Sequence, residues 1–198
     1  MSPGGGPAVT TVCFHGLVKQ QEHLATGSTP TPVLRPRNEA DLDECVRILG
    51  AVHERDGYPV NWPGQPDEWL TPPLLLASWV AELGGQVVGH VGLSRSGAGD
   101  AAPVLWSRQA GVPVTDVAVI SRLFVSPAAR GHGIGALLMA RAVQHAQESG
   151  LHPVLDVVAS DTSATVLYRR LGWDLLGTVD QQWSPSQTVT VHCYAAPA

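Results

Sequence analysis

Three glycines stand at the start of a predicted helix, in the stretch SPAARGHGIGALLMARAVQHAQESG at 126–150. Glycine costs about 1 kcal/mol relative to alanine inside a helix, so Gly131, Gly133 and Gly135 need a reason to precede a run rich in alanine and leucine. A helix N-terminus presents unpaired N–H groups and about half a positive charge, which together bind phosphate. Glycines there let a ligand approach the backbone closely, and Arg130 adds a bidentate cation. The stretch therefore predicts a phosphate-binding loop between a strand and a helix.

Other interpretations of this loop are open on the residues alone. Gly131, Gly133 and Ala136 fit the loose dinucleotide pattern G-x-G-x-x-G/A, and Asp156 follows about twenty residues later, as in that fold. Two observations disfavour it: Ser126–Arg130 separate the strand from the first glycine, and Asp156 falls inside its predicted strand. The P-loop is excluded because no Gly-Lys-Ser/Thr follows. A glycine turn that binds nothing is the third alternative.

Apolar periodicity predicts a mixed α/β sheet around the loop. Apolar residues at helical spacing follow Asn38 and stop at Gly57, and Gly84-Gly85 join two apolar runs as a hairpin turn does. The predicted elements are strands at 31–35, 117–125, 152–160, 173–179 and 188–194, a hairpin at 74–95, and helices at 38–57, 134–149 and 162–172. Their order, β-α-β-β-β-α-β-α-β-β, predicts an α/β (α+β) fold with a mixed central sheet of about seven strands flanked by helices.

The remaining segments are predicted to be irregular. Five prolines between Tyr58 and Pro73 exclude a regular element there, although Trp62 and Trp69 are expected to be covered from water. Residues 96–113 are also predicted to be a loop. Residues 1–30, rich in glycine, proline, serine and threonine, form either a tail or an extra strand, so the domain is predicted at 31–198.

Charge and composition exclude several classes of protein. The formal net charge of −5 argues against a general nucleic-acid binder. Three cysteines, far apart and odd in number, indicate neither a disulfide framework nor a zinc site. The N-terminal residues do not resemble a signal peptide, and no apolar run approaches the ~20 residues of a membrane span. We therefore expect a cytoplasmic protein without a metal, a membrane or a nucleic acid among its partners.

Two motifs resemble those of one enzyme family. The sequence LFVSPAARGHGIGALLMARA closely resembles the coenzyme A signature of the GNAT superfamily of N-acetyltransferases, R/Q-x-x-G-x-G/A after a strand that ends in a V-x-P-like turn. The sequence ASDTSATVLYRRLGW resembles the family's N-x-x-A-x-x-L-Y-x-x-x-G-F. The resemblance covers about residues 31–194, and the positions that fill the two motifs are Arg130, Gly133, Gly135, Ala164, Leu167, Tyr168 and Gly172.

The resemblance implies the GNAT fold and an acetyl-CoA-dependent N-acetyltransferase. It implies that backbone groups of Leu123 and Val125 bind the pantetheine arm, and that the thioester lies where strand 117–125 splays from 153–159. A substrate amine then attacks directly, without an acyl-enzyme. Tyr168 occupies the position of an acid that protonates the departing thiolate, or it packs one face of a short helix. The pyrophosphate is expected on the amides of Gly131, His132, Gly133, Ile134, Gly135 and Ala136.

Three departures from the family pattern leave roles open. Asp161 replaces a frequent asparagine and either contacts the cofactor or caps its helix. Trp173 replaces a phenylalanine. The strand 117–125 has no glutamate where some members keep a general base. The alternatives for that base are an ordered water held by Ser121, or a side chain among Asp116, His90, Glu68 and Asp56.

The acceptor is predicted to be an amine on a small molecule or a protein, bound by the segments 56–73 and 96–115. The first segment combines aromatic side chains with carboxylates, which favours an amine on a hydrophobic or aromatic body. Alternatively, its tryptophans only cover the edge of the sheet. A coenzyme A-binding module without catalysis is the rival function. Because many relatives are dimers, a homodimer is a further expectation.

Overall fold

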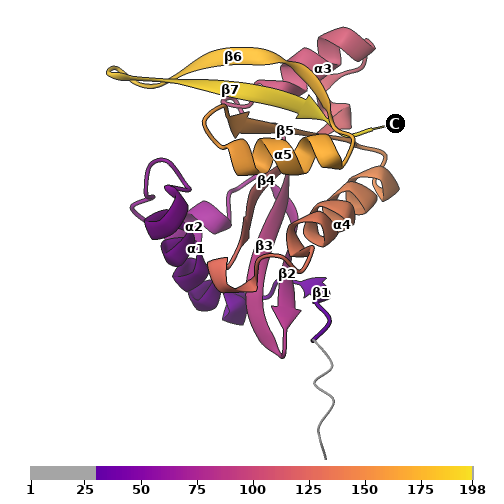
Figure 1. Cartoon of the computed structure of the whole chain (residues 1–198). Helices are drawn as coiled ribbons and strands as arrows, with labels where there is room; N and C mark the ends of the chain where they lie inside the picture. The colour runs from indigo at the N-terminus through magenta and orange to yellow at the C-terminus, as the bar shows by residue number, and fades with distance from the viewer. Residues whose placement is uncertain (1–29, 198) are drawn as a thin grey trace, which may run out of the picture.

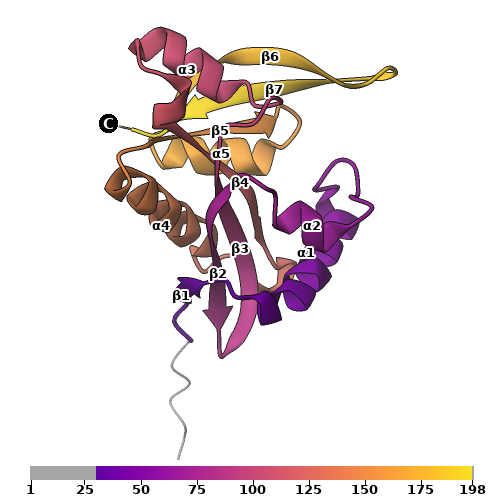
Figure 2. The same cartoon turned by 180° about the vertical axis from the view of Figure 1, so that it is seen from behind.

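The structure, a computed structural model, describes residues 30–197 as one sheet with helices on both sides (Figure 1, and from behind in Figure 2). The predicted tail, apart from Pro30, and Cys13 lie outside the described residues. The strands are β1 Val33–Pro36, β2 Leu75–Leu83, β3 Gln86–Arg95, β4 Val117–Val125, β5 His152–Val158, β6 Asp174–Ser184 and β7 Gln187–Ala195. The helices are α1 Leu42–Asp56, α2 Pro66–Leu70, α3 Ala102–Ala110, α4 Ile134–Glu148 and α5 Thr162–Arg170.

The seven strands are ordered β1-β2-β3-β4-β5-β7-β6. Only the β4–β5 pair among them is parallel, and the other five pairs are antiparallel. The β2–β3 hairpin turns through Gly84 and Gly85, whose φ angles are 61° and 79°. The predicted mixed sheet and its strand order along the chain are therefore confirmed.

Two predicted loops contain a helix. The prediction that residues 58–73 exclude a regular element is wrong for α2, which begins at Pro66. Proline is tolerated in the first turn of a helix because its missing N–H has no partner there in any case. The turn is completed by the N–H of Trp69, which donates to the C=O of Gln65 at 3.0 Å.

The prediction that 96–113 is a loop is wrong for α3. The Asp156 carboxylate on β5 accepts hydrogen bonds from the N–H groups of Ala101 and Ala102 at 2.7 and 2.9 Å. It therefore caps the helix from 54 and 55 residues away. Gly111 ends α3 with a φ of 70°. A local pattern cannot reveal an N-cap that comes from another strand.

The helices form two layers on the first half of the sheet, with α1 and α2 on one side and α4 on the other (Figure 1). Successive residues of a strand face opposite sides, and β2 shows this division. Val80 packs in the cluster of Ile48 from α1, whereas the next residue, Ala81, packs in the cluster of Leu138 from α4. All four side chains are 0 to 1% exposed.

Strands β4 and β5 separate in the middle of the sheet. Among the described residues, their pairing covers Val117–Val119 of β4 and His152–Val154 of β5. Beyond this, β4 continues along β3 to Val125, while β5 continues along β7 to Val158. A bulge in the β3–β4 ladder, at Arg122 with a φ of 56°, accompanies the separation. The splay that the resemblance implied is therefore present.

Two features are absent from residues 30–197. No helix in this part of the chain is long and apolar enough to cross a membrane. Nor do three or more His, Cys, Asp or Glu side chains gather there in a group that could hold a metal ion.

Candidate active site

The three glycines of the loop serve different purposes. Gly131 and Gly133 have φ angles of 86° and 71°, a conformation that side-chain-bearing residues rarely adopt. A Cβ added to either would meet nothing within 4 Å, so the space above the loop is open. Gly135 has an ordinary φ, and its Cβ would lie 3.4 Å from Leu167 Cδ2. The first two glycines shape the loop, and the third lets α4 pack closely against α5.

Helix α4 begins directly behind the loop, with Gly133 as its N-cap. The N–H groups of its first turn have no acceptor within the helix. They therefore point, with the positive end of the helix dipole, toward the open space above Gly131 and Gly133. This arrangement fits an anionic phosphate group, because that group needs N–H donors and close approach to the backbone.

Arg130 connects this loop to the end of α1. Its Nη1 donates to Asp56 Oδ1 at 3.2 Å, and its Nη2 donates to the other oxygen of the same carboxylate. The pair lowers the pKa of Asp56, chiefly through the hydrogen bond to Arg130. His132 lies beside them, with its Nδ1 3.2 Å from the carbonyl oxygens of Ala129 and Arg130, so it donates to the backbone of the loop.

The open edge of β4 carries the two predicted pantetheine-binding residues. The N–H of Ser126 donates to the C=O of Val88 on β3 at 2.7 Å. Backbone polar groups of successive residues in a strand point to opposite edges. Those of Leu123 and Val125 therefore face away from β3, toward the gap that β5 has left, while their side chains pack against the α4 cluster.

Tyr168 lies on α5 in an aromatic cluster. It is 7% exposed, and its ring centroid is 5.9 Å from that of Trp173 and 5.8 Å from that of Tyr194. Burial, and after it the nearby Tyr58, raises the pKa of the Tyr168 hydroxyl. The phenol therefore keeps its proton at neutral pH, as a general acid must.

Asp161 caps α5, one of the two roles predicted for it. Its Oδ1 accepts a hydrogen bond from the N–H of Ala164 at 2.9 Å. This bond satisfies one of the free donors of the first turn. A contact between Asp161 and a cofactor stays a prediction.

His90, one candidate for the general base, is fully buried on β3. Arg37 Nη1 lies 3.2 Å from its Nε2, and the C=O of Arg122 lies 2.9 Å from its Nδ1. A guanidinium only donates and a carbonyl only accepts, so Nε2 accepts, Nδ1 donates and the ring is neutral. Burial lowers the pKa of His90 to about 3. A neutral imidazole whose only lone pair is occupied cannot take a proton from an amine.

The other candidates for the base are dispersed. Asp56 is paired with Arg130, as described above, and Glu68 lies on α2 with an exposed side chain. Asp116 precedes β4 and accepts from Thr115 Oγ1 at 3.3 Å. Ser121, predicted to hold a water, lines the pocket described next and accepts from Arg122 Nη1 at 2.8 Å.

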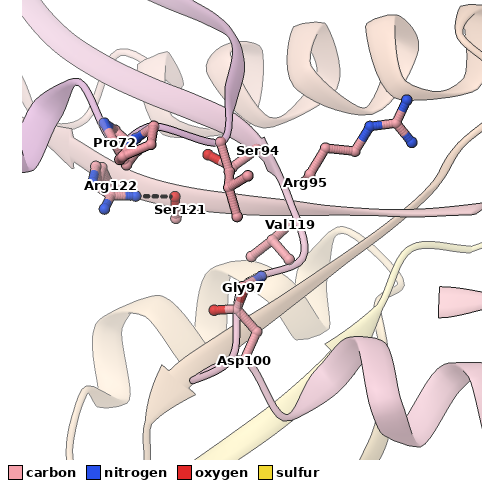
Figure 3. A pocket seen from close by; sticks show the side chains of 10 residues that line it. Pro72, Ser94, Arg95, Gly97, Asp100, Val119, Ser121 and Arg122 are labelled. Atoms are coloured by element: carbon pink, nitrogen blue, oxygen red, sulfur yellow. Dashed lines mark hydrogen bonds between the residues drawn. The ribbon is translucent and has the colours of Figure 1, made fainter. Parts of the chain in front are cut away.

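A cavity of about 390 Å³ lies beside the bulge of β4 (Figure 3). It is bounded by the segment after α2, by the end of β3 and the loop that follows it, and by β4. Both segments predicted to bind the acceptor thus contribute to it. Its lining residues are Pro72, Pro73, Leu74, Ser94, Arg95, Gly97, Asp100, Val119, Ser121 and Arg122.

The two tryptophans predicted to help bind the acceptor, Trp62 and Trp69, lie outside the lining of this cavity, and their contact with an acceptor stays a prediction. Trp62 is 42% exposed beside His53, which contradicts its expected cover from water. Trp69 lies instead under the guanidinium of Arg122, whose carbon is 4.9 Å from the ring centroid. Sequence reasoning missed Arg122, although it is the one charged residue within the apolar strand VAVISRLFV.

Tyr58 lies beside the residue that supports Arg122: its ring centroid is 6.2 Å from that of Trp69. Burial raises the pKa of the Tyr58 hydroxyl.

A sequence profile of the Acetyltransferase (GNAT) family matches residues 42–173, two thirds of the chain. The chain belongs to this family. The GNAT family uses acetyl-CoA, so the resemblance, the fold and the cofactor predicted from the two motifs are confirmed. A search of curated proteins gave no match to this sequence.

Several solved structures share this GNAT fold. NAA60 from Arabidopsis thaliana, solved in complex with acetyl-CoA, has a TM-score of 0.63 at 19% identity, covering 83% of this chain and 97% of that one. The ribosomal-protein-alanine N-acetyltransferase of Brucella melitensis has a TM-score of 0.62 at 22% identity, covering 84% and 99%. YncA from Salmonella typhimurium, solved with its cofactor acetyl-CoA, has a TM-score of 0.61 at 18% identity, covering 83% and 92%.

Proposed function

We propose that this GNAT protein is an N-acetyltransferase that transfers an acetyl group from acetyl-CoA directly to an amine of a small molecule or a protein. The observation that carries the proposal is the separation of β4 from β5 after Val119. It frees a strand edge that runs from the cavity at Arg122 to the glycine loop at Gly131. A protein amine belongs to the proposal because the Brucella neighbour is named for a ribosomal-protein alanine.

The residues around this edge fit the parts of acetyl-CoA, which supplies the acetyl group as a thioester. Gly131, Gly133 and the first turn of α4 fit the pyrophosphate, because they combine open space with unpaired N–H donors. The backbone of Leu123 and Val125 fits the pantetheine amides. The pair with Asp56 uses only part of the guanidinium of Arg130, which has five N–H donors, so the others are left for phosphate oxygens.

Tyr168 is proposed to protonate the departing thiolate. The hydroxyl is protonated at neutral pH because burial raises its pKa. A general acid of this kind contributes about 10²–10⁴-fold to the rate. No candidate base is required to touch the amine if a water held at Ser121 removes its proton, as predicted from the sequence.

The proposal is tested with the full chain by two measurements made side by side. Thermal shift with coenzyme A reports binding, and release of free thiol from acetyl-CoA over an amine panel reports transfer. We expect a shift with coenzyme A and thiol release that requires an amine. A shift without transfer to any amine would instead favour the non-catalytic coenzyme A-binding module, and no shift at all would remove the assignment of the loop.

A further inference from the structure

The cavity beside the bulge of β4 contains two opposite charges that are not paired with each other. Among the described residues, neither Arg122 nor Asp100 has an oppositely charged side-chain atom within 4.0 Å, yet both line this cavity. Burial lowers the pKa of the Arg122 guanidinium and raises the pKa of the Asp100 carboxyl. The two half-buried charges attract each other only from beyond 4.0 Å, and a charge withdrawn from water is stabilised by a closer partner. A ligand in the cavity could provide such a partner for each of them.

Arg122 is held in position by its neighbours. Its Nε donates to the C=O of Trp69, its Nη1 donates to Ser121 Oγ at 2.8 Å, and its guanidinium carbon lies 4.9 Å from the Trp69 ring centroid. Its backbone φ of 56° lies in the left-handed region, which residues other than glycine rarely adopt. These bonds leave Nη2 free of protein acceptors among the described residues, at the wall of the cavity (Figure 3).

Asp100 is fixed in the opposite wall of the cavity. Its Oδ2 accepts a hydrogen bond from the N–H of Gly97 at 2.6 Å. This bond orients the carboxylate but brings no positive charge. Asp156, which caps α3, is a second carboxylate in the vicinity and adds to the raised pKa of Asp100. A cation placed at Asp100 would offset both the burial of the carboxylate and its repulsion by Asp156.

Ser94 supplies the third polar group of the cavity. Its residue is 7% exposed, and its Oγ has no hydrogen-bond partner among the described residues. A buried hydroxyl left without a partner is destabilising, because it has lost its hydrogen bonds to water. Ser94 lines the same cavity as Arg122 and Asp100, and its shielded hydroxyl has no protein partner that a ligand would have to displace.

We propose that the acceptor is a small zwitterion, an amine that also carries a carboxylate, with Arg122 and Ser94 binding the carboxylate and Asp100 facing the amine. The proposal rests on the proposed N-acetyltransferase function, and it adds the class of acceptor. An arginine fork matches a carboxylate in geometry and charge. The volume of about 390 Å³ is near the lower end of the range for ligand pockets, which suits a molecule of amino-acid size.

The first test compares matched acceptors with the full chain and acetyl-CoA. The panel contains the common amino acids, their carboxamides and their decarboxylated amines, and thiol release is measured for each. We expect at least one amino acid to have a kcat/KM at least 30-fold above that of its carboxamide and of its amine. Equal values for the three members of every set would overturn the proposal.

The second test uses three variants on the best amino acid. Arg122→Gln should lower its kcat/KM at least 30-fold and leave the carboxamide within about threefold, while Arg108→Gln, an exposed arginine of α3, should change neither. Ser94→Ala removes a hydroxyl that has no protein partner, so it should fold as well as the native chain and lower kcat/KM several-fold. Parallel losses for the amino acid and its carboxamide in Arg122→Gln would contradict the proposal.

Calorimetry separates this proposal from the proposed function. The protein is saturated with coenzyme A and titrated with the same amino acids and carboxamides. Selective binding of an amino acid that Arg122→Gln abolishes, without transfer from acetyl-CoA to any amine, would support the zwitterion site and refute the enzyme. Transfer to amines without any preference for a carboxylate would support the enzyme and refute the zwitterion site.

Discussion

At the scale of single residues, Tyr168 is buried among aromatic rings, so a substitution tests its hydroxyl alone only if it keeps the ring. Tyr168→Phe keeps the ring against Trp173 and Tyr194 and removes only the hydroxyl. If this hydroxyl protonates the thiolate, kcat should fall at least tenfold while the Kd for acetyl-CoA barely changes. Steady-state kinetics and calorimetry on the same preparation measure both. Unchanged turnover would assign Tyr168 to packing alone.

Buried His90, a second single residue, is expected to make the stability of the folded protein depend on pH. The folded protein protonates this imidazole only below about pH 3, whereas its ordinary pKa is 6.5. The stability that depends on neutral His90 is therefore complete above pH 6.5 and is lost progressively as the pH falls toward 3, because the unfolded chain then binds the extra proton. The charges of Arg37 and Arg122 add to the cost of a charged imidazole, whereas the hydrogen bond from Nδ1 to the C=O of Arg122 partly offsets it.

His90→Gln tests this dependence. A glutamine amide can accept from Arg37 and donate to the C=O of Arg122, but it does not titrate. We expect the Tm of the native chain to fall more steeply than that of the variant between pH 7 and pH 4. The carboxylates are common to both proteins, so they cancel in the difference. Parallel curves would mean that His90 is not a neutral buried group.

At the scale of elements, α4 has a glycine with positive φ at each end, which provides a matched pair. Gly133 and Gly150 have φ angles of 71° and 69°, and an added Cβ meets nothing within 4 Å at either one. Valine at either position should cost similar stability through backbone strain. Only Gly133→Val should abolish acetyl-CoA binding, because only this end faces the phosphate site. Equal affinities of the two variants, measured by calorimetry, would argue against the phosphate loop.

Arg130 tests the same loop through charge. Arg130→Ala should weaken acetyl-CoA binding by about 1.5–3 kcal/mol, the range for a charge-assisted hydrogen bond. It should change the free energy of unfolding by at most about 1 kcal/mol, because its pair with Asp56 is partly exposed, at 42% and 33% of the two side chains. Asp56→Asn removes the competing carboxylate and should leave binding as tight or tighter. Full affinity in Arg130→Ala would exclude a phosphate contact.

At the scale of elements, a helix could be predicted from the sequence only where the residues that define its ends are its own neighbours. Helix α4 and its loop were predictable because their signals, the glycines and the apolar period, are local. Helix α2 was missed because its proline occupies the one position where proline fits. Helix α3 was missed because its cap, Asp156, lies on another strand. Local rules therefore predicted the elements whose ends are made by their own neighbours.

At the scale of the whole molecule, the cavity depends on contacts that no local pattern encodes. The sequence predicted that segments 56–73 and 96–115 bind the acceptor, and residues of both segments line the cavity. It did not predict the charges inside. Arg122 is turned toward Trp69 by a hydrogen bond between residues 53 positions apart, and Asp100 enters the wall because α3 is anchored to β5. The acceptor's chemistry is thus a property of the assembled fold.

Trp62, in the loop before α2, and Trp69, in α2, differ in their relation to the cavity. Trp69 contacts Arg122 through both its ring and its C=O, whereas Trp62 is 42% exposed beside His53. Loss of the ring in Trp69→Ala removes a cation–π contact of about 0.5–2 kcal/mol and frees the guanidinium. We expect a several-fold higher acceptor KM for Trp69→Ala with unchanged acetyl-CoA affinity, and no kinetic change for Trp62→Ala. If Trp69→Ala lowers the Tm by many degrees and leaves the acceptor KM unaltered, the ring supports only the fold, and Arg122 is positioned by its other bonds.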